Sequence, residues 1–188
     1  MLEINRASGI LLHVSSLPGK FGIGGMGSEA NRWIDFLEST GVKYWQILPL
    51  NPTGFGNSPY QGLSAFAGNP LFINPETLCE LGLVDAQALK KAPKFPKRRT
   101  DFQRVIQWKT GIFQTAYKKF KEHKAPLPIA RSFSRYKKEN NIWLNDFSLF
   151  MAIREENGLK SWSEWPTTLR VKDPDAIHQF HQTHLLEV

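Results

Sequence analysis

The first fifty residues alternate between apolar runs of strand length and a helical spacing of apolar positions. The two runs are Ile10–Val14 and Tyr44–Leu50. Between them, apolar side chains recur at intervals of three and four, at Ala30, Trp33, Ile34 and Leu37. That spacing indicates one face of an amphipathic helix, which Gly41 would end. We therefore predict a strand, a helix and a second, parallel strand over residues 8–50.

A longer helical pattern covers residues 100–160. One face of its first helix is apolar and comprises Phe102, Val105, Ile106, Ile112, Phe113, Ala116, Tyr117 and Phe120. Lys109 is the only charged residue within that stripe. A second helix is predicted further on, with Gly158 placed to end it. It carries Trp143, Phe147, Phe150 and Met151.

Between these two parts, residues 51–96 contain six prolines and five glycines. Such a density of residues that interrupt regular structure predicts an ordered loop region without helices or strands. Long segments of this kind are usually either functional or disordered. The aromatic residues and the scarcity of charge here argue against disorder.

The net charge of +7 is concentrated in one segment. Residues 90–139 hold 16 Lys and Arg and three acids, a local charge of +13, so the rest of the chain carries −6. A basic segment can bind nucleic acid. Here its aromatic residues already belong to the apolar stripe of a helix, so we favour a solvated helical face and expect no nucleic-acid partner.

Composition narrows the class of protein. The 188 residues are 41% hydrophobic, which excludes a mainly disordered or fibrous chain. The single cysteine, Cys79, excludes an internal disulfide framework and favours a reducing compartment. No apolar run reaches the roughly 20 residues of a membrane span, and no secretory signal is recognisable at the start. We expect a cytoplasmic protein without a membrane partner.

A GxGxxG pattern at Gly22, Gly24 and Gly27 lies between the predicted strand and helix, as in dinucleotide-binding proteins. Its context does not fit, because Ser15–Phe21 separate the glycines from the strand. The second strand also ends in Pro49-Leu50-Asn51, without the acidic residue that binds a ribose. We expect these glycines to shape a loop, and we expect no cofactor.

The histidines offer no clear metal site. His178, His181 and His184 recur every third residue, but no Asp, Glu or Cys at suitable spacing completes a ligand set. We interpret them as a polar segment and expect no metal. His13 comes just before a loop that follows a strand, and it fits a pocket residue or a hydrogen-bonded core histidine equally well.

The segment from Asn57 to Pro70 combines aromatic residues with Asn, Ser and Gln on a loop shaped by glycine and proline. Sugars bind to flat apolar rings flanked by amides and hydroxyls. No charged residue occurs between Lys43 and Glu76, which suits a neutral ligand. A sugar-binding loop and a tightly packed structural loop are equally compatible with this composition.

Several strings resemble one enzyme family over residues 6–182. They are Ser8-Gly-Ile-Leu-Leu-His-Val-Ser-Ser-Leu-Pro, Gly22-Ile-Gly, Trp45-Gln-Ile-Leu-Pro-Leu, Ser58-Pro-Tyr-Gln, Ser64-Ala-Phe-Ala-Gly-Asn-Pro and Trp143-Leu-Asn-Asp-Phe-Ser-Leu-Phe-Met-Ala. Together they resemble the 4-α-glucanotransferases, the amylomaltases or disproportionating enzymes of glycoside hydrolase family 77. The block from Ser58 to Pro70 is the most specific of them.

The resemblance implies an enzyme that transfers α-1,4-glucan segments to glucose or maltooligosaccharides by a retaining double displacement between two carboxyl groups. It also implies that Tyr60 stacks on the donor sugar beside the bond that is cleaved. Further substrate-binding candidates on the same loop are Ser58, Gln61, Ser64, Asn69 and Asn57. Asn57 stands where the family has Asp.

The implied fold is α/β, a (β/α)₈ TIM barrel with an inserted loop-rich and helical subdomain. Such a barrel needs about 200 residues or more, so we expect the N-terminal part of one, incomplete in this chain. The expected parts are a first β-α-β unit (1–50), a sugar-site insertion (51–99) and a helical insertion (100–188). The catalytic carboxylates are expected beyond residue 188, which leaves this chain inactive alone. The alternative is a non-catalytic α-glucan-binding protein.

Overall fold

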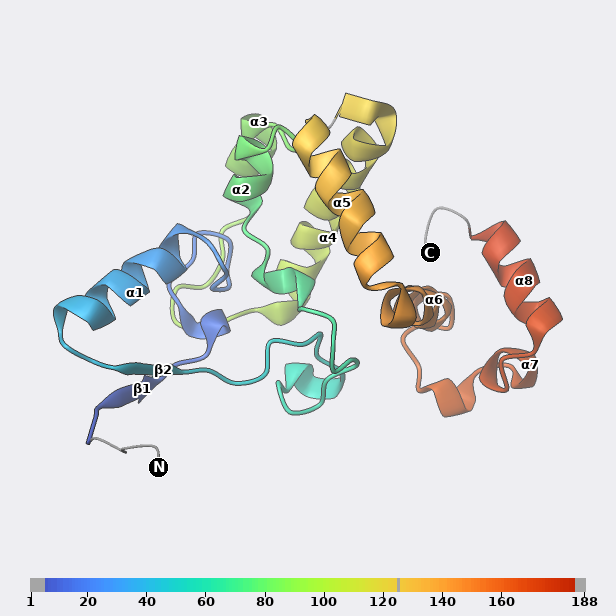
Figure 1. Ribbon diagram of the computed structural model, residues 1–188, viewed down its shortest axis with the longest axis horizontal. Coiled ribbons are helices and arrows are strands. Elements are labelled where there is room, and N and C mark those ends of the chain that lie inside the picture. Colours follow the sequence, from blue (N-terminus) through green and yellow to red (C-terminus); the bar gives the residue numbers. More distant parts are fainter. Residues whose placement is uncertain (1–5, 125, 185–188) are drawn as a thin grey trace. The chain divides into compact units, whose positions relative to one another are not determined.

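The structure is a computed structural model that describes residues 6–124 and 126–184, apart from the side chains of residues 123 and 124. The chain forms two compact units, Met1–Arg131 and Ser132–Val188 (Figure 1). Each unit has a hydrophobic cluster of its own. Within the described ranges, no helix combines the length and apolar character that crossing a bilayer requires.

A parallel pair of strands opens the first unit. β1 (Gly9–Leu11) pairs with β2 (Tyr44–Gln46), and α1 (Ser28–Ser39) connects them, which confirms the predicted order of strand, helix and strand. The strands are shorter than predicted. β1 ends because the chain turns into a 3₁₀ helix, η1 (Val14–Ser16), and residues after Gln46 then have no strand to pair with.

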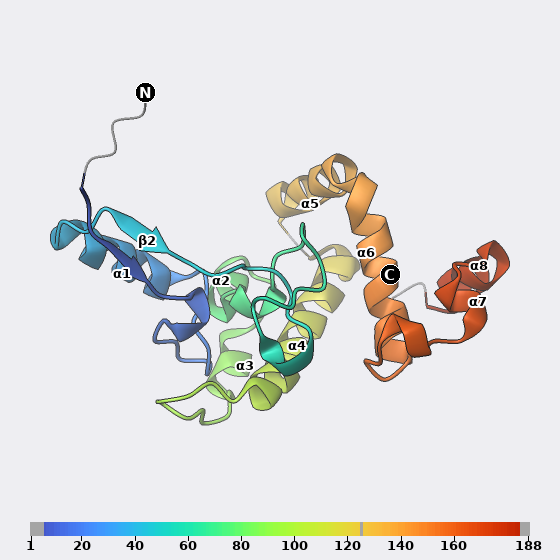
Figure 2. The same cartoon turned by 90° about the horizontal axis from the view of Figure 1, so that it is seen from below.

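One face of α1 lies against this strand pair (Figure 1, Figure 2). The Trp33 ring meets the Trp45 ring edge-on at 6.4 Å, and the Trp45 indole N–H donates to the Leu12 carbonyl at 2.7 Å. Ala30 and Leu37 are buried as predicted. Ile34 is not, since it lies at the edge of the covered face and remains 50% exposed.

The prediction of a region without helices over residues 51–96 is wrong in part. Two short α-helices, α2 (Pro75–Glu80) and α3 (Ala86–Lys90), and two 3₁₀ helices, η2 (Phe55–Asn57) and η3 (Pro70–Phe72), form there. The Asn74 side chain accepts the Glu76 N–H at 2.7 Å and so caps α2, whose first residue is Pro75. Asn followed by Pro therefore starts a helix here, because proline tolerates the first helical position.

The basic helix is α4 (Phe102–Lys119), followed by a π-helical turn, η4 (Phe120–Lys124). Its predicted apolar face is confirmed at the centre, where Val105, Ile112 and Ala116 are buried. The edges of that face, Ile106 and Tyr117, are 41% and 42% exposed. The main cluster of the first unit combines α4 with the N-terminal loop and η3 and contains Val14, Leu17, Ile23, Ala30, Leu71, Phe72 and Val105.

Lys109 lies in the middle of the buried face of α4 and is 2% exposed. Its ammonium group donates to the Leu71 carbonyl at 2.6 Å and to the Ile73 carbonyl at 2.8 Å. Burial lowers the pKa of Lys109 to about 8. A buried cation needs such partners, because an unpaired one costs several kcal/mol. The bonds join α4 to η3 and to the residue that follows it.

The second unit is helical. α5 (Leu127–Glu139) leads into it, followed by α6 (Asn141–Glu156), a 3₁₀ helix, η5 (Trp162–Glu164), α7 (Thr167–Arg170) and α8 (Pro174–Thr183). As predicted, α6 carries the aromatic-rich segment, and Gly158 follows its end with a φ of +65°. The cluster of this unit contains Leu149, Ala152, Ile153, Trp165 and Phe180.

Replacing Lys109 with methionine should destabilise the first unit. Lys109→Met keeps the apolar length of the side chain but leaves two carbonyls without a donor. We expect the free energy of unfolding to fall by about 2 kcal/mol, since each unsatisfied buried group costs about 1–3 kcal/mol. Urea unfolding measures the change. The matched control is Lys118→Met, an exposed position on the same helix, which should stay within about 0.5 kcal/mol of the parent. Equal effects of the two substitutions would contradict this role.

The pH dependence of stability should also report on Lys109. In the unfolded chain its pKa is the ordinary 10.5, and in the folded chain about 8. Between these values the unfolded state binds more protons, so raising the pH favours the folded state at this residue. We expect the stability difference between the parent and Lys109→Met to grow from about pH 8 to pH 10. A difference that stays constant over this range would show that Lys109 does not titrate there.

Candidate functional site

The segment from Asn51 to Pro70 forms a loop closed at its base. Thr53 and Gly62 form an antiparallel bridge. Close to it, the Gly54 N–H donates to the Gln61 carbonyl at 2.7 Å, and the Leu63 N–H donates to the Pro52 carbonyl at 2.8 Å. At the far end the Asn69 N–H donates to the Leu50 carbonyl at 2.7 Å. Main-chain bonds thus define the path of the loop.

Three aromatic side chains of this loop face solvent. Phe55 is 91%, Tyr60 74% and Phe66 72% exposed. The backbone beneath Tyr60 is held, because its N–H donates to the Ser58 hydroxyl at 3.4 Å and the next N–H to the Ser58 carbonyl at 3.1 Å. A large apolar ring in water on an ordered backbone is available to stack on a ligand.

Two of the predicted site residues shape the loop itself. The Ser64 hydroxyl accepts the N–H groups of Phe66 at 3.1 Å and Ala67 at 3.0 Å. The Asn69 side chain is 8% exposed and accepts the Leu71 N–H at 3.0 Å, which caps η3. A serine hydroxyl that accepts a bond still has a proton to donate, so Ser64 retains one function for a ligand.

Two of the predicted site residues, Asn57 and Gln61, are amides with unpaired side chains in the described part of the chain. Asn57 has a φ of +54°, a conformation that Asn and Asp tolerate better than most residues. The loop therefore carries Tyr60, the Ser58 and Ser64 hydroxyls, and two amides between residues 57 and 64.

Asn51 is not among the predicted site residues, yet it has an unusual environment at the base of the loop. Its Oδ1 is buried without a hydrogen-bond partner among the described residues. Gly62 packs so closely on the Asn51 amide that any side chain at position 62 would overlap it. The sequence signal for Asn51 is its position, because it directly follows the predicted apolar run Tyr44–Leu50 and precedes Pro52.

The GxGxxG glycines serve packing. A side chain at Gly24 would overlap the Val14 carbonyl, and one at Gly27 would overlap the Asn74 amide. Gly22 has a φ of +80°, which a side chain disfavours. Neighbouring chain occupies the space over Gly24 and Gly27, so they form no open cradle for a pyrophosphate.

His13, His178 and His184 make local contacts within the fold. His13 meets the Phe72 ring edge-on at 5.4 Å, and burial lowers its pKa. His178 contacts Gln182 at 2.9 Å, and His184 stacks on Phe180 with ring centroids 4.1 Å apart. In the described part of the chain, no group of three or more His, Cys, Asp or Glu residues is arranged to hold a metal ion.

Comparison with known proteins identifies the family. The family pattern described as 4-alpha-glucanotransferase, glycoside hydrolase family 77, matches residues 12–188. The chain belongs to this family. It is 40% identical over 178 residues to the 4-alpha-glucanotransferase of Thermus thermophilus, an alignment that covers 95% of this chain and 35% of the relative. For the Synechocystis enzyme the identity is 41% over 172 residues, with 92% and 34% covered.

A solved amylomaltase structure has the same fold over this region. The amylomaltase from Streptococcus agalactiae in complex with acarbose superposes with a TM-score of 0.87 at 35% identity. The match covers 95% of this chain and 36% of that one. This chain thus spans about a third of the length of the relatives it matches. The resemblance drawn from the sequence motifs and the α/β class are confirmed.

Proposed function

We propose that this chain supplies part of the donor-sugar site of a 4-α-glucanotransferase, which moves α-1,4-linked glucan segments to glucose or maltooligosaccharide acceptors. The observation that carries the proposal is Tyr60, 74% exposed on an ordered and uncharged loop in a chain of this family. The single cysteine, Cys79, supports the further proposal of a reducing, cytoplasmic setting.

The chemistry of the loop fits a neutral sugar. An exposed tyrosine ring provides a platform for the C–H face of a glucose unit. On the same loop, Ser58 and Ser64 offer hydroxyls, and Asn57 and Gln61 offer amides, for the ring hydroxyls of the sugar. The structure of the Streptococcus agalactiae relative was solved in complex with acarbose, which supports a carbohydrate ligand in this family. Asn69 contributes by holding the end of the loop.

We assign no carboxylate of this chain to catalysis. A retaining transfer needs two carboxyl groups about 5–5.5 Å apart, one as the nucleophile and one as the acid and base. The loop and its flanks, residues 44–75, contain neither Asp nor Glu. Asp35 and Glu38 lie exposed on α1 and have no part in this loop. The two carboxylates belong to the part of a family member that this chain does not include.

We also propose that the strand pair belongs to a (β/α)₈ barrel that is incomplete here. In the register of β1 and β2, Leu11 and Tyr44 lie on the face opposite Trp45. They are 56% and 65% exposed, although α1 covers the other face. An exposed apolar face of a parallel sheet is typical of a sheet that other elements cover. The division into residues 1–50, 51–99 and 100–188 stays part of this proposal.

A non-catalytic α-glucan-binding protein is the second candidate. It is favoured by the three exposed aromatic rings of the loop, which occur without any neighbouring carboxylate. The two candidate functions predict different affinities of this chain for maltooligosaccharides. A part of a larger donor site should bind maltooligosaccharides weakly, whereas a binding protein should bind them at micromolar concentrations.

The chain alone should not disproportionate maltotriose. Without two catalytic carboxyl groups it lacks both the nucleophile and the proton donor. We expect no glucose release above the blank when the purified chain is incubated with maltotriose. A full-length relative, such as the Thermus thermophilus enzyme, is the positive control. Glucose release that scales with the concentration of the chain would overturn the assignment of the carboxylates.

Tyr60→Ala should weaken binding of maltooligosaccharides about tenfold, because aromatic stacking contributes about 0.5–1.5 kcal/mol beyond area burial. Tyr60→Phe should retain most of the affinity, since the ring is kept. Titration of both variants with maltoheptaose, followed by NMR chemical shifts, measures the change. The matched control is Tyr136→Ala, which removes an exposed tyrosine of α5 outside the loop. Equal loss in Tyr60→Ala and Tyr136→Ala would exclude a specific role for Tyr60.

A further inference from the structure

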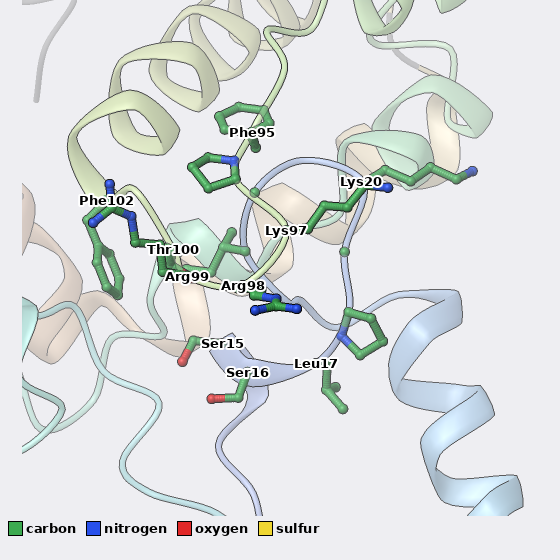
Figure 3. Close-up of a pocket in the computed structure, with 15 residues that line it drawn as sticks. Ser15, Ser16, Leu17, Lys20, Phe95, Lys97, Arg98, Arg99, Thr100 and Phe102 are labelled. Atoms are coloured by element: carbon green, nitrogen blue, oxygen red, sulfur yellow. The ribbon is translucent and has the colours of Figure 1, made fainter.

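A cavity of about 810 Å³ lies in the first unit between residues 15–23 and residues 95–102 (Figure 3). The side chains of Lys97, Arg98 and Arg99 at its edge are exposed and leave their loop in three different directions. They therefore do not converge on one ligand. The lining also shares no residue with the loop from Asn51 to Pro70, so the cavity is separate from the candidate sugar site.

A closer arrangement is found at the base of the sugar loop, where Asn51 packs on Gly62. The three atoms nearest to a Cβ added at position 62 would be Nδ2, Cγ and Oδ1 of Asn51, and the first two would overlap it. Gly62 is not one of the glycines with a positive φ, so its backbone would accept a side chain. Glycine is needed at position 62 because the Asn51 carboxamide already occupies the place of that side chain.

Hydrogen bonding does not account for the Asn51 carboxamide. Its Oδ1 is buried, and the side chain has no hydrogen-bond partner among the described residues. Asparagine in turns and at helix starts usually accepts a main-chain N–H, as Asn69 and Asn74 do in this unit. A buried acceptor without a donor lowers stability. Proteins tolerate such costs at functional sites, so Asn51 calls for a role other than stabilising the fold.

The contact between Asn51 and Gly62 joins the two limbs of the loop, residues 51–54 and residues 61–63. Thr53 and Gly62 form an antiparallel bridge between the limbs. Main-chain hydrogen bonds on the two sides of the bridge measure 2.7 and 2.8 Å. Asn51 leads into the first limb, and its carboxamide packs on the second. The carboxamide therefore sets the spacing of the limbs from the side that the bridge leaves open.

Tyr60 directly precedes the second limb. Its N–H donates to the Ser58 hydroxyl at 3.4 Å, and the Gln61 N–H donates to the Ser58 carbonyl at 3.1 Å. The Gln61 carbonyl in turn accepts the Gly54 N–H across the limbs. The Tyr60 ring is 74% exposed, so little packing holds the ring itself. Its position depends on the backbone beneath it, and that backbone continues into Gly62.

We propose that Asn51 is a positioning residue of the sugar loop. By filling the place of a side chain at position 62, its carboxamide supports the second limb and thereby places the Tyr60 ring for stacking on the sugar. The inference rests on the proposed function, since it takes Tyr60 as the platform for a glucan. The role of Asn51 is steric and acts through Tyr60, and Gly62 is the complementary half of the same contact.

Titration with maltoheptaose, followed by NMR chemical shifts, tests this role. Asn51→Ala should weaken binding about threefold, because the second limb loses its support. The unfolding temperature should stay the same or rise, since the substitution also removes an unpaired buried acceptor. Unchanged affinity would overturn the proposal, and so would a joint fall of affinity and unfolding temperature, which indicates packing alone. The matched control is Asn31→Ala, an exposed asparagine of α1, which should leave the affinity unchanged.

A combined substitution shows whether Asn51 acts through Tyr60. Asn51→Ala/Tyr60→Ala should bind maltoheptaose no more weakly than Tyr60→Ala, because the effects of two coupled residues do not add. Additive losses would mean that Asn51 contacts the sugar directly, which would overturn a positioning role.

The pairing of Asn51 with Gly62 is tested without a ligand. Gly62→Ala should lower the unfolding temperature by about 5 °C, because the added methyl group overlaps the Asn51 carboxamide. Most of this loss should disappear in Asn51→Ala/Gly62→Ala. The matched control is Gly68→Ala in the same loop, where an added Cβ meets nothing within 4 Å and the unfolding temperature should not change. Additive shifts would overturn the pairing.

Hydrogen exchange separates a failure of this inference from a failure of the proposed function. Absence of maltoheptaose binding by the parent chain would contradict the proposed function. The Gly54 amide, which bonds across the two limbs, still reports on Asn51 in that case. We expect this amide to exchange about threefold faster in Asn51→Ala than in the parent. Equal exchange rates would overturn the support of the second limb by Asn51.

Discussion

The buried ammonium group of Lys109 is the interaction on which the first unit depends. It donates to the Leu71 and Ile73 carbonyls from the middle of α4, in a surrounding where any cation without partners would be costly. The same contact sets α4 against the end of the candidate sugar loop. Since the Asn69 side chain caps the 3₁₀ turn at that end, loop and helix are held together. The hydrogen bonds of Lys109 within an apolar core thus hold the end of the loop against α4.

The backbone of the loop is held by hydrogen bonds, while several of its side chains remain exposed. Main-chain bonds and the Ser64 and Asn69 side chains hold the backbone of the loop. Among the described residues, the side chains of Tyr60, Asn57 and Gln61 have no hydrogen-bond partner, and in our proposal they are the groups that meet the sugar. Positive charge is kept in another part of the unit, in the cavity beside Arg98. The uncharged loop and the segment with three consecutive cations, Lys97, Arg98 and Arg99, are thus separate parts of the chain.

Much of the fold follows from apolar periodicity. The helical faces of α1 and α4, the parallel strand pair and the glycines that follow α1 and α6 were predicted, because each depends on local spacing. The two short helices between residues 75 and 90 were not. Their signal, Asn74 followed by Pro75, lies in a proline-rich stretch, and there proline was interpreted as a residue that interrupts helices. Both strands are also shorter than the apolar runs that predicted them, because a strand ends where its pairing partner ends and not where the apolar residues end.

By itself the sequence determined the family, the candidate loop and the uncharged character of that loop, because these depend on residue identity and order. It also marked Lys109 as the only charged residue of an apolar stripe. Only the tertiary structure decided what Lys109 does, since its carbonyl partners lie 36 and 38 positions away in the chain. The same holds for the cavity between the segments around Ser15 and Arg98, which come together because the core beneath them packs residues distant in sequence.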